Sequence, residues 1–232
     1  MHAMILAAGR GARLRPLTDV LPKPLIEVGN KPLIEYHLHH LAQAGCRQVV
    51  INLGWLGDRI SSALGDGSRF GLTIRYSPEP PGALETAGGI VQALPLLGGG
   101  PFVVVAGDIL CDFPLARLAP PPPGALAHLV MVENPDHHRD GDFALEDGWL
   151  QLTGRKRWTF SGIGVYQPAL FAGLSPGKRP LRPVFEAAIA AGQVSGRLHQ
   201  GYWSDVGTAE RLALAQHSPM VNNWAAEQRD TS

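Results

Sequence analysis

The first half of the chain alternates short apolar runs with longer segments of helical periodicity. Four runs rich in aliphatic residues predict buried strands, at residues 3–8, 49–53, 72–77 and 102–106. Three segments with apolar residues at helical spacing lie between them, at residues 32–44, 58–64 and 86–94. Gly45 follows the first of these at a position typical of a helix end. Apolar strands separated by helices predict an α/β fold, doubly wound around a mixed, mainly parallel sheet.

The pattern changes at residues 120–123, four consecutive prolines that form neither a helix nor a central strand. Shorter β-like segments follow, at residues 126–133, 143–145, 150–152 and 161–167. Asp147-Gly148 suits a hairpin turn between two of them. Two helices are expected at 184–191 and 209–215, with a last strand at 200–206. We therefore expect one domain at residues 1–217, an α/β half (1–119) with a smaller β-rich lobe (124–217), and a loose tail at 218–232.

Composition limits the possible partners. The 232 residues include 20 Lys plus Arg and 20 Asp plus Glu, so the formal net charge is zero. Proteins that bind nucleic acid or anionic membranes usually carry a basic excess, and neither partner is expected here. Cys46 and Cys111 are the two cysteines, which excludes a disulfide framework and a four-cysteine zinc site. Without a signal-type N-terminus or a run of 18 apolar residues, we expect a soluble cytoplasmic protein, monomeric or a small homo-oligomer.

A glycine-rich loop follows the first predicted strand directly. Gly9 and Gly11 let the backbone approach a ligand with free amides turned toward phosphate oxygens. A nicotinamide-binding loop would need a third glycine where Leu14 stands, and Pro16 interrupts the helix that should follow. The Gly-Lys-Ser/Thr ending of a Walker loop is also absent. With the fixed positive charge of Arg13 beside it, the loop predicts triphosphate binding rather than an oxidoreductase.

Lys23 lies between Pro22 and Pro24. Two prolines restrict the backbone and fix the direction of the side chain between them. An isolated lysine of this kind is usually an exposed loop residue, but its place shortly after a phosphate-type loop predicts a role at the phosphates. We expect an exposed ammonium that adds little to the stability of the fold.

Two aspartates are candidates for a magnesium site. Asp108 follows the apolar run 102–106, and the carboxyl ends of parallel strands are where α/β sheets bind ligands. Asp205 lies after an aromatic pair in the second half. Mg²⁺ is usually held by one or two carboxylates together with substrate phosphates. Each aspartate alone is also compatible with a turn or a helix cap, and for Asp205 a helix does follow at once.

Several motifs together resemble the sugar-1-phosphate nucleotidylyltransferases. The run LAAGRGARLRPLT is followed by PKPLIEVGNKPLIEY, and LETAGG, VAGD, FSGIG and YWSDVG occur further along the chain. The resemblance covers residues 1 to about 215. It implies a nucleotidyltransferase fold of Rossmann-like type, in which 1–119 binds the nucleotide and 124–217 the sugar phosphate.

The resemblance also implies roles for individual residues. Lys23 and Arg13 are the implied catalytic residues, and Asp108 and Asp205 the implied ligands of Mg²⁺. Nucleotide binding is implied for Leu6, Ala8, Gly9, Gly11, Ala12, Arg13, Lys23, Glu79, Leu84, Thr86 and Gly88. Acceptor binding is implied for Ala106, Gly141, Asp142, Lys156 and Gly162. Two positions depart from the family, since Ala12 replaces a hydroxyl residue and Ala106 an asparagine, which affects affinity or specificity more than reaction type.

The second half offers two further sets of polar residues. The basic segment at residues 155–157 suits either the sugar phosphate or a lactyl carboxylate, and equally a solvated loop. Gly141 and Asp142 suit either the sugar hydroxyls or a polar turn. His137 and His138 would point to opposite faces of a strand, so we expect no metal site there, nor at the cysteines.

Chain length and the segments GDGSRFGLTIRYSPE, GDF and TFSGIG are most similar to the branch that transfers UMP from UTP to N-acetylmuramate 1-phosphate. The expected partners are UTP and a sugar 1-phosphate, in peptidoglycan recycling. The alternatives within the family are guanylyl transfer to mannose 1-phosphate and UTP- or dTTP-dependent transfer to glucose 1-phosphate. A non-catalytic nucleotide-sugar sensor on the same fold is a further alternative, although a sensor has no need for the lysine and both aspartates.

Overall fold

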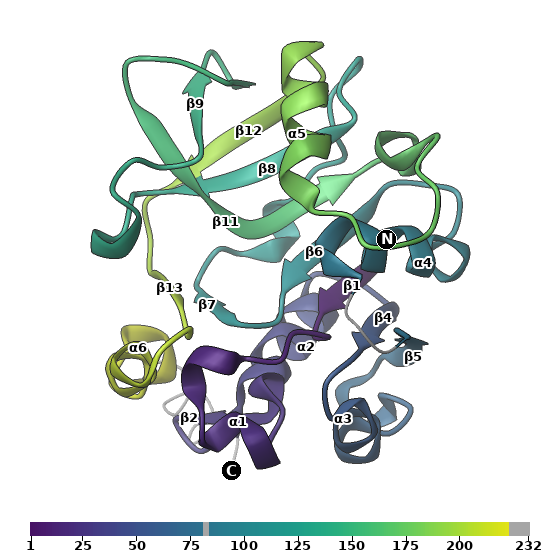
Figure 1. Cartoon of the computed structure of the whole chain (residues 1–232), viewed down its shortest axis with the longest axis vertical. Coiled ribbons are helices and arrows are strands. Elements are labelled where there is room, and N and C mark those ends of the chain that lie inside the picture. Colours follow the sequence, from purple (N-terminus) through teal and green to yellow (C-terminus); the bar gives the residue numbers. More distant parts are fainter. Residues whose placement is uncertain (81–83, 223–232) are drawn as a thin grey trace.

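A computed structural model describes residues 1–80 and 84–222 and contains one mixed nine-stranded sheet (Figure 1). The strand order is β5-β4-β1-β6-β11-β8-β12-β10-β9. The strands are β1 (His2–Leu6), β4 (Gln48–Leu53), β5 (Thr73–Pro78), β6 (Phe102–Ala106), β8 (Ala127–Val132), β9 (Phe143–Glu146), β10 (Trp149–Gln151), β11 (Arg157–Tyr166) and β12 (Val194–His199). Two small ladders pair β2 (Glu27–Val28) with β3 (Lys31–Pro32) and β7 (Ile109–Cys111) with β13 (Trp203–Asp205).

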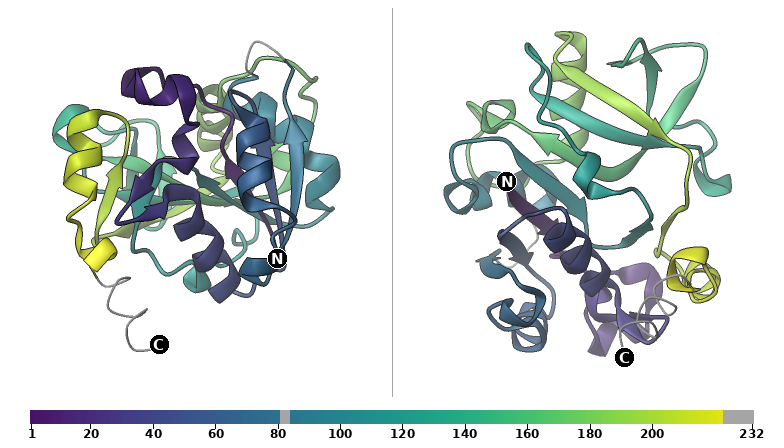
Figure 2. Two further views of the ribbon diagram at one scale, coloured as in Figure 1. Left: turned by 90° about the horizontal axis from the view of Figure 1, so that it is seen from below. Right: turned by 180° about the vertical axis from the view of Figure 1, so that it is seen from behind.

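Helices cover both faces of this sheet, as predicted (Figure 2). The helices are α1 (Leu17–Val20), α2 (Leu33–Gln43), α3 (Gly57–Leu64), α4 (Glu85–Leu97), α5 (Leu181–Ala190) and α6 (Ala209–Ala215). Alternate residues of β1 point to opposite faces, so Ala3 and Ile5 pack in the core beneath α2 and α3. Met4 packs in the second core, beneath α4 and α5. The α/β doubly wound prediction is therefore confirmed.

The strands of the second half extend the same sheet. β11 pairs antiparallel with β6, and β8 pairs antiparallel with β11. The strand expected at 200–206 is shorter, because only Trp203–Asp205 pairs, with β7. The sequence prediction missed β12, which pairs parallel with β8 over six residues. Its segment, VSGRLH, contains a glycine and a charged residue and lacks the apolar alternation of an ordinary strand.

The expected hairpin turn at Asp147-Gly148 is present between β9 and β10. Both residues have positive φ, 49° for Asp147 and 83° for Gly148, which is the backbone twist that a two-residue hairpin turn requires. Asparagine, aspartate and glycine tolerate this conformation best, which explains why this dipeptide predicted the turn correctly.

The start of the C-terminal tail differs from the expectation of a loose segment. Met220 and Val221 are each only 7% exposed and pack in a core with Val28 and Tyr36. The Gln216 side chain connects the end of α6 to the β2–β3 ladder, because its amide accepts from Gly29 N and donates to Glu27 O. The ordered part therefore extends to at least residue 222, and residues 223–232 lie outside the described residues.

His37 on α2 makes stability depend on pH. Burial lowers the pKa of this imidazole to about 3, and its Nε2 atom has no hydrogen-bond partner among the described residues. Between pH 6.5 and 3 the unfolded chain binds a proton at His37 that the native chain does not bind. The free energy of unfolding therefore decreases as the pH is lowered. We expect His37 to remove about 1.4 kcal/mol of unfolding free energy for each pH unit below 6.5.

Denaturant unfolding of the wild type and His37→Leu at pH 7.5, 6.5 and 5.5 measures this effect. The free energy of unfolding of His37→Leu should decrease less between pH 6.5 and 5.5 than that of the wild type. His217→Leu is the control, because His217 is exposed in the turn that follows α6, and its replacement should leave the slope unchanged. Equal slopes for the wild type and His37→Leu would contradict the prediction.

Candidate active site

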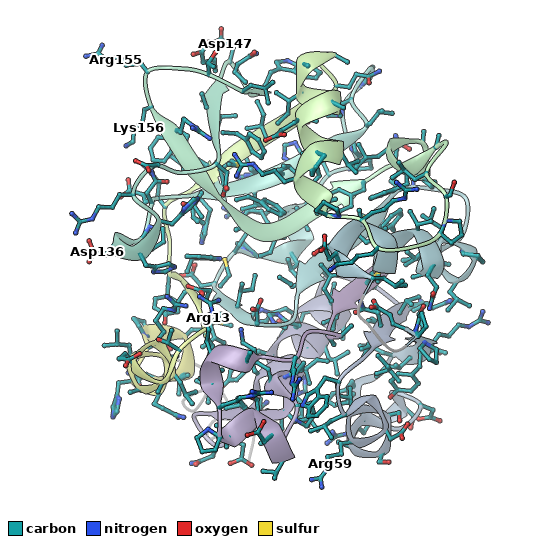
Figure 3. The ribbon with its side chains drawn as sticks, viewed as in Figure 1. Arg13, Arg59, Asp136, Asp147, Arg155 and Lys156 are labelled. Atoms are coloured by element: carbon teal, nitrogen blue, oxygen red, sulfur yellow. The ribbon has the colours of Figure 1, made fainter. Side chains whose placement is uncertain are left out.

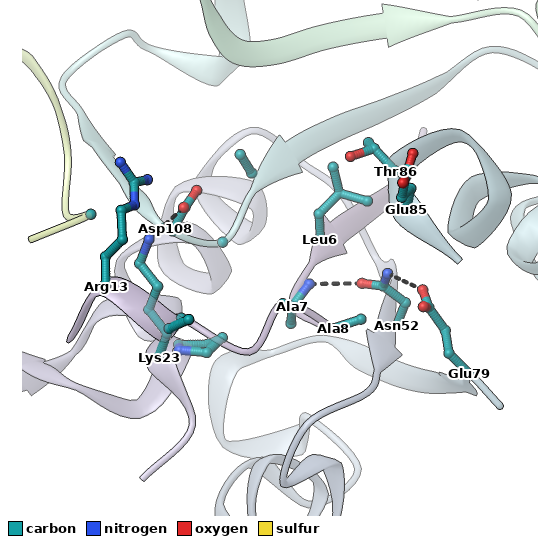
Figure 4. Close-up of a pocket in the computed structure, with 17 residues that line it drawn as sticks. Leu6, Ala7, Ala8, Arg13, Lys23, Asn52, Glu79, Glu85, Thr86 and Asp108 are labelled. Carbon is teal, nitrogen blue, oxygen red and sulfur yellow. Dashed lines mark hydrogen bonds and ion pairs between the residues drawn. The ribbon is translucent and has the colours of Figure 1, made fainter. Parts of the chain in front are cut away.

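A cavity of about 420 Å³ opens at the carboxyl ends of β1, β4, β5 and β6, where open α/β sheets bind ligands (Figure 4). From β1 the chain adds β4 and then β5 on one side of β1, and it then returns to add β6 on the other side, so the cavity lies at the point where the strand order reverses. This first cavity is lined by Leu6, Ala7, Ala8, Gly9, Gly11, Ala12, Arg13, Lys23, Pro24, Asn52, Glu79, Glu85, Thr86, Ala106, Gly107, Asp108 and Gly207. Arg13, Lys23 and Asp108 gather at one end, and Glu79, Glu85 and Thr86 at the other.

The predicted glycine-rich loop forms the floor of this cavity. Gly11 has φ 64°, which favours glycine, and a Cβ there would lie 3.0 Å from Thr18 Cγ2 and 3.2 Å from Lys23 Cβ. The Thr18 hydroxyl donates to Gly11 O at 2.9 Å and fixes the loop from below. The loop is therefore held in shape while its upper side faces the cavity.

Lys23 is placed as predicted but is not exposed. The residue is only 7% exposed, and its ammonium lies 2.5 Å from Asp108 Oδ2. Its backbone begins a short 3-10 helix (Lys23–Leu25), and Pro22 precedes this helix in an extended conformation. The prolines thus direct the lysine inward, under the glycine-rich loop, where its stem packs against Gly11. The expectation of an exposed ammonium is wrong, and because this lysine is buried and paired we now expect it to contribute to the stability of the fold.

The three arginines in and beside the loop have different places, and the Arg10 guanidinium lies 4.4 Å from the centre of the Trp55 ring. Arg13 lines the first cavity, and Figure 3 shows it between the two halves of the molecule. Arg15 forms an ion pair with Asp19 at 3.1 Å on the surface instead. Arg13 is therefore the arginine that can reach a bound phosphate.

The structure brings the backbone of the two predicted metal aspartates together. β13 pairs antiparallel with β7, and Val206 N donates to Asp108 O at 2.8 Å. The Asp108 carboxylate lines the first cavity and is 43% exposed. Asp205 does not line the cavity; its Oδ2 pairs with Arg211 at 2.9 Å.

Asp205 nevertheless has an open acceptor. Its Oδ1 atom is buried and accepts no hydrogen bond from any described residue, although His137 Nε2 lies 3.1 Å away outside hydrogen-bonding geometry. A buried carboxylate oxygen without a donor suits a cation, and carboxylate oxygens are the protein ligands that Mg²⁺ prefers. The donor set of Asp108 and Asp205 therefore fits a divalent cation.

Glu79 is held at the other end of the first cavity by a hydrogen-bonded chain. Asn52 at the end of β4 accepts from Ala7 N at 2.7 Å and donates to Glu79 Oε1 at 2.7 Å. Glu79 Oε2 accepts from Leu84 N at 3.0 Å. Asn52 and Glu79 thereby connect the carboxyl ends of β1, β4 and β5. The sequence prediction missed Asn52, although it is the one polar side chain within the apolar run 49–53.

Two residues that were predicted to bind the nucleotide, Leu84 and Gly88, line neither this cavity nor the second cavity described below. Leu84 has a buried side chain and uses its backbone N–H on Glu79. Gly88 donates its N–H to Arg179 O at 3.2 Å and packs against the 177–179 loop. Residues 81–83, between Glu79 and Leu84, are outside the described part of the chain.

A second cavity, of about 460 Å³, adjoins the first and shares Leu6, Glu85, Thr86 and Ala106 with it. Its lining is completed by Asp142, Phe143, Phe160, Gly162, Tyr166, Pro180, Leu181, Arg182 and Phe185. The pairing of β11 with β8 is irregular between Phe160 and Ile163, which places Gly162 in this wall. Asp142 is fixed by accepting from Phe160 N at 2.8 Å. Of the predicted acceptor residues, Ala106, Asp142 and Gly162 meet here.

Gly141 and Lys156 line neither cavity. Gly141 takes φ 63° in the turn before β9. Lys156 Nζ lies 3.7 Å from the centre of the Trp158 ring, and Figure 3 shows Lys156 and Arg155 at the outer edge of the second half. Arg157 donates to Asp142 O from its Nε at 3.2 Å and so braces the wall of the second cavity. Arg155 and Lys156 are therefore exposed, whereas Arg157 begins β11 and contacts Asp142.

The histidine pair lies in a short 3-10 helix, Asp136–His138, and not on a strand as expected. His137 approaches Asp205, and His138 Nε2 lies 3.2 Å from Asp142 Oδ1. The two side chains therefore contact the aspartates of two different parts of the site. The reason given for expecting no metal site at this pair, opposite faces of a strand, was wrong, because a helical turn lets neighbours reach toward one side of the molecule.

One other group of metal-type side chains lies in the described ranges. Cys111, Asp112 and His199 offer atoms within 4.8 Å of one another. His199 Nε2 is 2.6 Å from Asp112 Oδ1, and burial raises the pKa of the Cys111 thiol to about 12. A hydrogen-bonded pair beside a neutral, buried thiol accounts for the cluster. Both cysteines are buried, as expected of small apolar side chains.

Across residues 1–80 and 84–222, no helix is both long and apolar enough to cross a membrane.

Comparisons with known proteins agree with this architecture. The family described as nucleotidyl transferase matches residues 2–120. An N-acetylmuramate alpha-1-phosphate uridylyltransferase of Neisseria meningitidis is 53% identical over 93% of this chain and 97% of the relative. A mannose-1-phosphate guanylyltransferase catalytic subunit beta of Xenopus tropicalis is 31% identical over 89% of this chain and 61% of the relative.

The fold has solved counterparts. A Bacillus anthracis structure described as a glucose-1-phosphate thymidylyltransferase in complex with sucrose superimposes with a TM-score of 0.80. It is 22% identical, and the match covers 96% of this chain and 99% of that one. The strand-end cavity, the matched domain and the near full-length similarity lead to one conclusion: the chain belongs to the sugar-1-phosphate nucleotidylyltransferase family.

Proposed function

We propose that this protein transfers UMP from UTP to N-acetyl-α-D-muramate 1-phosphate, forming UDP-N-acetylmuramate and pyrophosphate. The observation that carries this assignment is the 53% identity to a uridylyltransferase of that specificity, over nearly the full length of both chains. The two adjoining cavities support it, because a nucleotide and a sugar phosphate must meet for the reaction. We place the reaction in the cytoplasm, as a step of peptidoglycan recycling.

The reaction is an in-line displacement at the α-phosphorus of UTP. An oxygen of the sugar phosphate forms the new bond to this phosphorus as the bond to the pyrophosphate oxygen breaks on the opposite side. Such transfers depend on positioning and on charge stabilisation more than on covalent catalysis. We assign the triphosphate to the amides of the Gly9–Ala12 loop and to Arg13, which line the first cavity.

Lys23 and Asp108 form the charged centre of the proposed reaction. A divalent cation, Mg²⁺ in our proposal, held by Asp108 and Asp205 would supply charge neutralisation at the phosphates. In the unliganded geometry the Lys23 ammonium is already aimed at the same carboxylate, so it can contact phosphate oxygens without a large rearrangement. The glycine-rich loop above the lysine stem limits its other conformations.

A grid of nucleoside triphosphates and sugar 1-phosphates tests the assignment by pyrophosphate release with Mg²⁺. UTP with N-acetylmuramate 1-phosphate should give the highest kcat/KM. A preference for GTP with mannose 1-phosphate, or for UTP or dTTP with glucose 1-phosphate, would contradict the substrate assignment while keeping the reaction type. Binding of nucleotide sugars without turnover of any pair would instead indicate a sensor.

A further inference from the structure

Arg182 is the one cationic side chain among the described residues that line the second cavity. It lies in the first turn of α5, which covers the sheet beside β8 and β11 (Figure 1). The cations expected at the phosphates, Arg13 and Lys23, line only the first cavity. A sugar phosphate that reacts with UTP must place its phosphate near the first cavity, so Arg182 is not needed for that group.

The guanidinium is held in a defined orientation. Its Nε donates to Glu186 Oε1 at 2.8 Å, and its Nη1 lies 3.3 Å from Asp142 Oδ1. Its Cζ lies 5.6 Å from the centre of the Phe143 ring. None of the described residues accepts a hydrogen bond from Nη2, and the side chain is 52% exposed. A guanidinium carries five N–H donors, so several stay available to a ligand.

Asp142 and Glu186 both pair with this guanidinium, and each carboxylate also faces other partners or solvent. Asp142 accepts from Phe160 N through one oxygen, and His138 Nε2 lies 3.2 Å from the other. Glu186 holds the Nε edge of the guanidinium and is 43% exposed to solvent, which screens its charge. The Nη edge is therefore the part of this network that can accept a new anion.

Glu85 and Thr86 line the side of the second cavity that it shares with the first, and the wall around Arg182 is largely aromatic and aliphatic. Phe160 and Phe143 each pack edge-on against Phe185, with ring centres 5.5 and 6.5 Å apart. Such a wall suits methyl groups and the apolar face of a sugar ring. A neutral sugar needs hydroxyl partners here, which Asp142 offers, but it does not need a guanidinium. A planar guanidinium matches a carboxylate with two parallel hydrogen bonds.

We propose that Arg182 binds a carboxylate substituent of the acceptor sugar, the lactyl group of N-acetylmuramate 1-phosphate, and selects this acceptor over the same sugar without the lactyl group. The inference rests on the proposed function and deepens it, because it names the residue that recognises the acidic substituent. Arg182 is then a specificity-determining residue outside the phosphate-transfer centre.

Steady-state kinetics with UTP and two acceptors tests this role. The acceptors are N-acetylmuramate 1-phosphate and N-acetylglucosamine 1-phosphate, which carries a hydroxyl in place of the lactyl ether. The second is measured as a competitive inhibitor wherever it is not turned over. Arg182→Gln should raise KM for the muramate acceptor about 10- to 100-fold with kcat changed less than about threefold. The constants for the glucosamine acceptor should change less than about threefold.

Two further variants sharpen the experiment. Arg182→Lys keeps the charge without the planar fork and should recover part of the lost affinity. Arg197→Gln is the matched control, because Arg197 is exposed on β12 in the same lobe and lines neither cavity, so the loss of its charge should leave both acceptors unchanged. Melting curves should move by less than about 2 °C for each variant, since both side chains are largely exposed.

The outcomes separate this inference from the proposed function. A selective loss of the muramate acceptor in Arg182→Gln supports it. An equal change for both acceptors, or no change for either, overturns it and leaves the proposed function intact. A wild-type protein that transfers no UMP to N-acetylmuramate 1-phosphate overturns the proposed function and this inference together.

Discussion

Asp108→Asn should lower kcat by at least about two orders of magnitude, because a cation that neutralises phosphate charge contributes several kcal/mol to such a transfer. The carboxylate lies in the first cavity, contacts Lys23 and is 43% exposed, so it is accessible to a ligand. The near-isosteric amide removes the charge and leaves the buried Lys23 ammonium without its counterion, so we also expect a loss of about 1–3 kcal/mol of unfolding free energy, which a melting curve measures. The measurement is a titration of activity with Mg²⁺ for the wild type and the variant.

Asp112→Asn is the control for this prediction. Asp112 is an exposed aspartate at the opposite end of β7 that pairs with His199, away from both cavities. Its loss should leave the Mg²⁺ dependence unchanged. If Asp108→Asn instead keeps wild-type activity at every Mg²⁺ concentration, Asp108 is only the structural partner of Lys23.

Asp205→Asn should reduce activity on the same scale but also stability. Its Oδ2 pairs with Arg211, and both side chains are mostly buried, 18% and 15% exposed. The amide leaves the arginine without its counterion, which we expect to cost about 1–3 kcal/mol of unfolding free energy. A melting curve of the variant is therefore needed, and its activity has to be measured at a temperature below the melting transition. An unchanged rate at saturating Mg²⁺ would make Asp205 a structural residue.

The sequence could predict the strand-end part of this site because local patterns determine it. The run 102–106 ends at Asp108, and the first strand leads into a glycine-rich loop, so the parallel sheet alone brings these residues to one edge. β1 and β6 are paired neighbours in the structure, as this reasoning requires. The same logic could have included Asn52, which also ends a predicted strand.

Other parts of the site depend on contacts between distant segments. Arg182 stands between prolines 180 and 183, and a proline-rich segment shows no pattern that would assign it to a cavity. The 3-10 helix of His137 and His138 has no helical periodicity to predict it. The burial of Lys23 arises from the loop that folds over its stem, an arrangement in which Gly11 and Thr18 take part. No local pattern predicts the contacts of Arg182, His137 and His138, or the ion pair that Lys23 forms with Asp108, 85 residues away in the sequence.

Lys23→Ala should reduce kcat by roughly a hundredfold or more, the scale seen when one preorganised charge-stabilising donor is lost. The ammonium is fixed before substrate arrives, since Pro22 and Pro24 restrict its backbone and Asp108 holds it at 2.5 Å. Charge on the phosphates shifts from the attacking to the leaving group during the reaction. A fixed cation can therefore interact more strongly with the transition state than with bound substrate, and its loss affects kcat as well as KM.

The buried position of Lys23 means that the alanine variant should also be less stable, by about 1–2 kcal/mol, and melt a few degrees lower. Lys23→Met separates the two effects, because it keeps most of the stem and removes only the charge. We expect Lys23→Met to regain most of the lost stability and none of the lost kcat, whereas Lys23→Arg, with its bulkier fork, should restore activity only in part. Arg197→Met is the control for loss of a cation outside both cavities. An unchanged kcat with a raised KM in Lys23→Met would show that Lys23 only binds substrate. An unchanged kcat/KM would show that its charge has no part in the reaction, because the methionine stem alone would then account for everything the residue does.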